Sequence, residues 1–122
     1  MQDLKFTTAG DYMNNQFDKD MDYFNRIADT NGFETRWSIY SDDETFGFTR
    51  MNEKSPFSAG TVIRNRCDVW GYDTSAIVGG NGSWVDVWQA CDKVIKEAND
   101  HHIYIEGFER LEDGTIGVVT GS

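Results

Sequence analysis

The sequence predicts one α+β domain, residues 1–122, with a largely antiparallel sheet of five to six strands and two amphipathic helices packed on one face. Three observations predict this class. Two segments repeat apolar residues at helical spacing, and several shorter ones alternate apolar and polar residues as strands do. Turn residues join these strands as hairpins, without a sustained strand–helix–strand rhythm, which favours an antiparallel sheet. The length fits one domain and leaves no room for a second core.

The first helix is expected to begin near Thr8, because Thr8 and Asp11 have the spacing of a capping box. Apolar residues then recur at steps of three and four, as in an amphipathic helix: Met13, Phe17, Met21, Phe24, Ile27 and Ala28. Asn31-Gly32 supplies the left-handed residue that commonly ends a helix.

The next segment predicts a hairpin. Residues 33–40 alternate, with Phe33, Thr35 and Trp37 on one face. An acidic turn at 42–44 leads into 45–51, so we expect the two runs to pair. Residues 52–60, which include the only proline, are expected to form a loop.

Residues 61–70 predict a third strand with two different faces. One face is apolar, whereas Arg64, Arg66 and Trp70 share the other. Trp70 is therefore expected either to be packed or to belong to a ligand surface. Residues 76–78 predict a further short strand.

The clearest helix follows a glycine-rich loop at 79–83. Ser83 and Asp86 have capping-box spacing, and Asn99-Asp100 ends the helix. Its apolar stripe, which we expect to lie in the core, comprises Trp84, Val87, Trp88, Cys91, Val94, Ile95 and Ala98.

The C-terminal segment predicts a second hairpin. Strands at 103–110 and 115–120 flank Asp113-Gly114, a dipeptide typical of tight turns.

The stretch Gly80–Ala98 resembles the start of the last helix in double-stranded-RNA-binding domains. The shared features are a glycine-rich strand end, a serine cap and an alanine-containing helix. The chain departs from that pattern at Trp84-Val85-Asp86, where those domains carry lysines. The resemblance therefore implies an α-β-β-β-α core and does not extend to RNA binding.

Composition excludes several function classes. The chain has 21 acidic and 11 basic residues, a formal net charge of −10, which argues against direct binding of nucleic acid or of an anionic membrane. No apolar run is long enough to cross a membrane, and the N-terminus lacks a secretory pattern, so a cytoplasmic location is expected, including that of a phage-infected bacterial host. Cys67 and Cys91 are expected to be free, buried thiols.

The acidic residues motivate the leading functional hypothesis. It is a small non-enzymatic protein that inhibits a partner with a basic surface, of the phage counter-defence type (anti-CRISPR or antirestriction) or the toxin-immunity type. The candidate contact residues form two clusters: Asp18, Asp20 and Asp22, and Asp42, Asp43 and Glu44. Ordinary solubilising charge is the alternative explanation of these clusters. The sequence also leaves a homo-oligomer open.

A second hypothesis is a small-molecule binder that sequesters a nucleotide-like or phosphorylated ligand. Arginine recognises phosphate in a planar, bidentate way, and a glycine-rich loop before a helix offers free N–H groups. The candidate ligand residues are Arg36, Arg64, Arg66, Trp70, Gly80, Asn81, Gly82 and Ser83. The alternative is that the arginines pair with acids across the open face of the sheet.

Catalytic arrangements are poor in this sequence. His101 and His102 are adjacent, so on a strand they would point to opposite faces. Neither they nor the cysteines have the spacing of a metal site, so we expect no catalytic residues, no metal and no cofactor. A weak enzyme that uses one of the histidines is the third reading.

Overall fold

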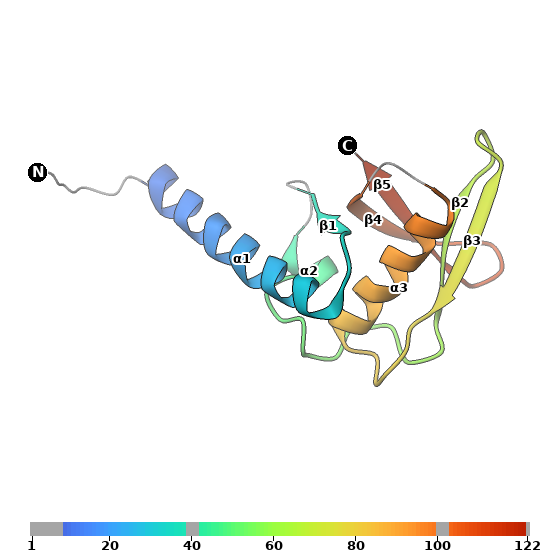
Figure 1. Cartoon of the computed structure of the whole chain (residues 1–122), viewed down its shortest axis with the longest axis horizontal. Coiled ribbons are helices and arrows are strands. Elements are labelled where there is room, and N and C mark those ends of the chain that lie inside the picture. The colour runs from blue at the N-terminus through green and yellow to red at the C-terminus, as the bar shows by residue number, and fades with distance from the viewer. Residues whose placement is uncertain (1–8, 39–41, 100–102, 122) are drawn as a thin grey trace, which may run out of the picture.

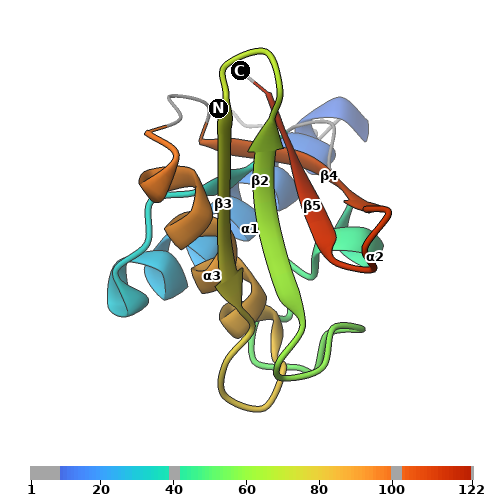
Figure 2. The ribbon, with the colours of Figure 1, turned by 90° about the vertical axis from the view of Figure 1, so that its right-hand side faces the viewer.

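The computed structural model describes residues 9–38, 42–99 and 103–121. Its helices and strands, in chain order, are α1 (Ala9–Asn31), β1 (Arg36–Trp37), α2 (Asp43–Phe46), β2 (Val62–Cys67), β3 (Tyr72–Ile77), α3 (Trp84–Glu97), β4 (Tyr104–Arg110) and β5 (Ile116–Gly121). α1 and α3 lie on the same side of one five-stranded sheet (Figures 1 and 2). The predicted α+β class is therefore confirmed.

The sheet is mixed: its two long pairings are antiparallel, in line with the expected largely antiparallel sheet, and two short pairings are parallel. Its strand order is β1-β4-β5-β2-β3. The hairpins β2–β3 and β4–β5 are antiparallel, the second of them as predicted, but β1 pairs with β4 and β2 pairs with β5 in parallel. These parallel contacts join segments far apart in the chain, so no local turn signal announces them.

Both long helices follow their sequence patterns. α1 ends where Gly32 takes a φ of 75°, while Thr8, at its expected start, lies outside the described residues. Ser83 and Asp86 form the predicted capping box of α3. On its buried face α3 carries Trp84, Val87, Trp88, Cys91, Val94 and Ile95.

The hairpin expected between 33–40 and 45–51 is wrong. The alternation of Phe33, Thr35 and Trp37 does mark buried positions, but only two residues pair as β1. Residues 43–46 form the short helix α2, which begins at Asp42 as N-cap and ends at Gly47 in the left-handed conformation. The predicted turn is thus the start of a helix, because the Asp42 carboxylate accepts the Thr45 N–H.

β2 and β3 form a hairpin, and both strands differ in length from the strands predicted there. β2 stops at Cys67, so Trp70 belongs to the tip of the hairpin and not to the arginine face of a strand. β3 begins at Tyr72, earlier than the predicted strand at 76–78. The α-β-β-β-α order holds with α2 inserted, yet β1 and β2 are not neighbours, so the core differs from a simple three-stranded meander.

An aromatic cluster joins the helices to the sheet. Phe24 of α1 contacts Trp88 of α3 with ring centroids 4.9 Å apart, and Trp84 and Trp88 are fully buried as predicted. Trp37 stacks on Phe48 at 3.9 Å. The N-terminal turns of α1 extend away from this body (Figure 1).

Candidate functional site

Arg64 and Arg66 lie on the open face of β2 and are neutralised by neighbouring acids. Arg64 forms ion pairs with Asp73 of β3 and with Asp113 of the β4–β5 turn. Arg66 donates to Glu112 at 2.8 Å. The hydrogen bond from Arg64 lowers the pKa of Asp73, and that from Arg66 lowers the pKa of Glu112. Arg64 and Arg66 therefore pair with acids across the open face of the sheet, as the alternative explanation expected. These acids belong to β3 and to the β4–β5 turn.

Arg36 lies apart from the other two arginines. It is on β1, and β4 and β5 separate that strand from β2. Its guanidinium donates to the carbonyl oxygens of Phe33 and Thr35 at 3.2 and 3.1 Å and lies over the Phe24 ring. The three arginines therefore do not converge on one anion site.

The glycine-rich loop already holds an internal carboxylate. Oδ2 of Asp86 accepts hydrogen bonds from the N–H groups of Asn81 and Ser83 and from the Ser83 hydroxyl. Gly80 lies so close to Asp86 that a Cβ there would come within 2.5 Å of it. The Gly82 carbonyl accepts the N–H of Ser55 at 2.8 Å. Asp86 thus takes the place that a phosphate would need at the start of α3.

The acids of α1 remain accessible. Asp18 and Asp22 are exposed and Asp20 is partly exposed. Asp22 pairs with Arg26 one turn later, and Asp20 accepts from Gln16 at 2.9 Å. Within the described ranges, Asp18 and Asp20 form no ion pair.

The acids at α2 have structural tasks. Asp42 caps the helix through Thr45, and Asp43 accepts the Thr49 N–H at 2.8 Å and pairs with Arg50. Burial raises the pKa of Asp43, but the bonds from Thr49 and Arg50 outweigh it and leave the pKa below its ordinary value. Glu44 is exposed, and its carboxylate forms no ion pair with a described residue.

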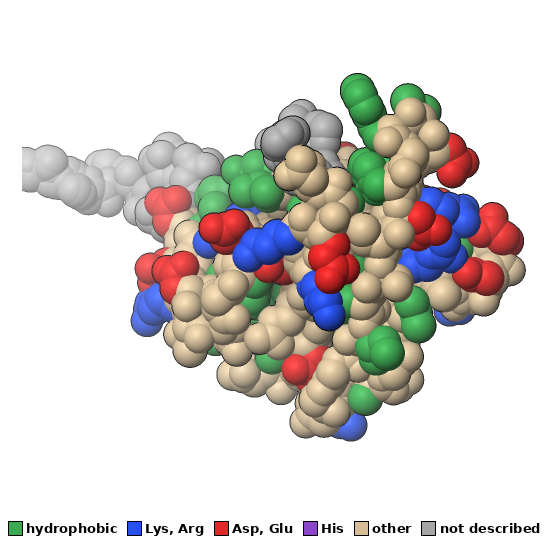
Figure 3. All heavy atoms as spheres, turned by 45° about the vertical axis from the view of Figure 1, so that its right-hand side comes forward, with side chains coloured by type: hydrophobic (Ala, Val, Ile, Leu, Met, Phe, Trp, Pro, Cys, Tyr) green, Lys and Arg blue, Asp and Glu red, His purple; other side chains and the backbone are tan. Residues whose placement is uncertain are grey.

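The tip of the β2–β3 hairpin exposes two large apolar side chains. Val69 is 87% and Trp70 79% exposed, although turn positions usually carry small or polar residues. Figure 3 shows apolar side chains projecting at this end of the molecule. The sequence offered a signal for this feature, because Asp68 and Gly71 bracket Val69-Trp70 as turn residues would.

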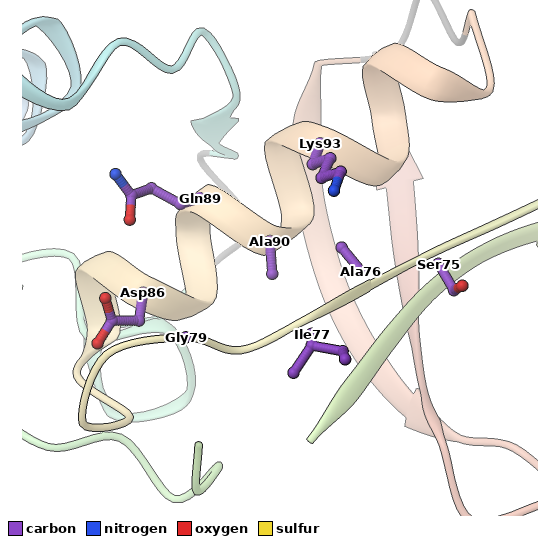
Figure 4. A pocket seen from close by; sticks show the side chains of 8 residues that line it. All are labelled: Ser75, Ala76, Ile77, Gly79, Asp86, Gln89, Ala90 and Lys93. Atoms are coloured by element: carbon purple, nitrogen blue, oxygen red, sulfur yellow. The ribbon is translucent and has the colours of Figure 1, made fainter. Parts of the chain in front are cut away.

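A groove that sequence reasoning missed runs between β3 and α3. Its volume is about 480 Å³, and its lining includes Ser75, Ala76 and Ile77 of β3 and Asp86, Ala90 and Lys93 of α3. Ala76 and Ala90 point toward one another across it (Figure 4). No strand of the described ranges pairs with the outer side of β3, so the groove borders a free sheet edge (Figure 2).

The cysteines and histidines form no recognisable catalytic group in the described part of the chain. Cys91 is fully buried, and burial raises the pKa of its thiol far above the ordinary value. Cys67 is half-buried, and both thiols are free. His101 and His102 lie outside the described residues. The described side chains contain no cluster suited to a metal ion, and none of the described helices is long and apolar enough to span a membrane.

The chain matches no known protein family: no family model fits it, and neither the curated proteins nor the solved structures contain a match.

Proposed function

We propose that this chain is a small acidic, non-enzymatic protein that binds and inhibits a partner with a basic surface, with the acids of α1 at the contact. Counter-defence by a phage and immunity against a toxin are two settings in which such an inhibitor would act, and the bacterial cytoplasm would be its location. The partner's basic groove would recognise a row of carboxylates as it recognises phosphates.

The observation that supports this proposal is that several basic side chains are engaged in ion pairs within the fold. Arg50, Arg64 and Arg66 each pair with acids of the same fold. The acidic excess is therefore left on other surfaces, among them α1, where Asp18 is exposed and Asp20 is partly exposed on a different side of the helix.

The same observation weighs against the small-molecule reading. An anion would have to displace Asp73, Asp113 and Glu112 from the two arginines on β2, and Asp86 from the loop before α3. Each displacement would leave a carboxylate without its present partner, which costs free energy. A protein partner is therefore favoured over a small anionic ligand.

The test is a binding measurement with a matched charge control. Affinity capture from the expression host identifies a partner, and the Kd of the purified pair is then measured at several salt concentrations. In one variant Asp18→Asn, Asp20→Asn and Asp22→Asn are combined. We expect its Kd to rise by about tenfold or more at low salt, and its salt dependence to become shallower, because exposed charges are screened over about 10 Å at 0.1 M salt.

The control removes equal charge elsewhere. Glu53→Gln, Glu97→Gln and Glu109→Gln neutralise three other exposed acids. A contact on α1 predicts a much smaller effect for this control. Equal effects of the two triple variants would mean general attraction without a defined site, and an unchanged Kd in the α1 variant would rule the proposal out.

A further inference from the structure

We propose that a second copy of this chain docks on the free edge of β3, antiparallel to it, so that the two sheets become continuous and each hairpin tip enters a cavity of the other copy. The sheet has two edges, and they differ in protection. β1 is only two residues long, which blunts an edge. β3 has six residues in unbroken register with β2, and it contains no Lys, no Pro and no bulge.

The outward backbone groups of β3 are available for such a pairing. Val78 exchanges hydrogen bonds with the β2 side, since its N–H donates to Thr61 and its carbonyl accepts from Gly60. Backbone groups alternate in direction along a strand, so those of Asp73, Ser75 and Ile77 point away from β2. Asp73 is the one charged residue of β3, and it forms an ion pair with Arg64 of the neighbouring strand β2.

With a two-fold axis beside Ala76, the β3 strands of the two copies pair with one another in antiparallel register. Ser75 of one copy then faces Ile77 of the other, and their outward N–H and C=O groups form hydrogen-bonded pairs. The two Ile77 side chains, each 65% exposed in the single chain, become diagonal neighbours on the open face of the sheet. Ala76 meets Ala76 on the helix side, where both side chains are small.

Under the same two-fold symmetry, the charged groups that line the groove of one copy face groups of opposite charge in the other copy. α3 runs antiparallel to β3, because Thr74 bonds the Val94 carbonyl near one end and Gly80 lies beside Asp86 near the other. Rotation about Ala76 brings the Asp86 end of one α3 towards the Lys93 end of the other. Lys93 is exposed and forms no ion pair with a described residue, and the loop uses only Oδ2 of Asp86. Two strongly acidic chains would thus meet where each presents one acid and one base.

In this arrangement the exposed hairpin tip of each copy lies next to a cavity of the other copy. The hairpin tip with Trp70 lies beyond one end of β3 and the Gly82 loop beyond the other, so the two-fold axis beside Ala76 brings the tip of one copy towards the Gly82 loop of the other. That loop borders a cavity of about 420 Å³ whose lining includes Pro56, Phe57 and Asn81. Lys54 lines the same cavity, and Asp68 precedes the apolar tip, so opposite charges also meet there.

Sedimentation equilibrium of the full chain tests the proposal. At concentrations on the order of 0.1 mM, an association with a micromolar Kd is nearly complete and reads as twice the 13.9 kDa chain mass. Ile77→Lys is expected to abolish the dimer, because it places two lysines next to one another on the joined edge. Ile103→Lys is the matched control at an exposed position before β4 and should leave the dimer intact. A wild-type monomer at this concentration, or a dimer that survives Ile77→Lys, would overturn the proposal.

The tip and its cavity are tested by a charge exchange. Trp70→Ser should weaken the dimer by about 30-fold, as expected for a buried aromatic anchor. Asp68→Lys and Lys54→Asp should each weaken it, and the double variant should restore it. Within one chain Asp68 lies at the tip of the β2–β3 hairpin, whereas Lys54 lies beside Ser83, beyond the other end of β3, so only contact between copies can produce the rescue. A dimer insensitive to Trp70→Ser, or one not restored by the exchange, overturns the register. Far-UV circular dichroism checks that each variant is folded.

Discussion

Asp92 offers the sharpest test of how this fold is held together. Its carboxylate on α3 is nearly buried and ties the helix to the segment before β1. Oδ1 accepts the N–H groups of Glu34 and Thr35 and the Thr35 hydroxyl, at 2.9, 3.1 and 2.9 Å. Oδ2 lies 3.0 Å from the ammonium group of Lys96. Removing this carboxylate therefore removes one anchor between two segments that are far apart in the chain.

The magnitude of Asp92→Ala follows from these contacts. Hydrogen bonds to an ionised acceptor contribute about 1.5–3 kcal/mol each, and a buried donor left unpaired costs about 1–3 kcal/mol. Thr35 is 1% exposed, so water cannot replace the lost acceptor without a rearrangement. Because contributions within one network are not additive, we expect a loss of about 3–5 kcal/mol in the free energy of unfolding. Asp92→Asn keeps one oxygen acceptor and should lose less.

Urea unfolding followed by tryptophan fluorescence measures this loss, with Glu97→Gln as the control at an exposed position of the same helix. Burial raises the pKa of Asp92, but the bonds from Glu34, Lys96 and Thr35 outweigh it, so the pKa in the folded protein lies below the ordinary 3.8. The stabilisation is therefore fully present above the ordinary pKa of 3.8 and is lost as the pH falls below that value and through the lower folded pKa. A loss under 1 kcal/mol for Asp92→Ala at pH 7, or a loss that does not shrink in acid, would refute this reasoning.

Two further predictions follow from the packing. Gly47→Ala would place a Cβ 2.2 Å from the ring of the buried Trp84, so unfolding experiments should show a loss of about 3 kcal/mol or more; Gly114→Ala, with a φ of 87° and open space around it, should lose only about 1–2 kcal/mol. Cys91 should stay unreactive towards a thiol reagent in the native protein at pH 8 while Cys67 reacts, so Cys67→Ser should leave no reactive thiol until urea is added. Rapid native labelling of Cys67→Ser would contradict the buried position of Cys91.

Local chemistry made several elements readable from the sequence. The apolar stripes and the Ser83–Asp86 capping box predicted the two long helices, and Asp113-Gly114 predicted the C-terminal hairpin. Each of these signals acts over a few residues, where spacing and turn preference decide the conformation. The strand predicted at 45–51 is wrong because the acidic segment at 42–44 is typical of a turn, whereas the Asp42 cap and the left-handed Gly47 make a helical turn there.

The candidate sites were readable only in part. The positions of Asp18, Asp20 and Asp22 on an exposed helix follow from its apolar stripe. The sequence does not show which acids pair with Arg64 and Arg66. Asp73 reaches Arg64 from the next strand, and Glu112 reaches Arg66 from a distant turn. The sequence showed that Trp70 is apolar, but its 79% exposure depends on where β2 stops.

The sequence by itself determined the acidic balance, the α+β class, the two long helices and the C-terminal hairpin, because composition and short-range spacing suffice for these. Only the tertiary structure decided the strand order, the parallel pairings of β1 with β4 and of β2 with β5, and the free edge of β3. Those features depend on contacts between residues far apart in the chain, and a strand carries the same local pattern whichever neighbour it pairs with.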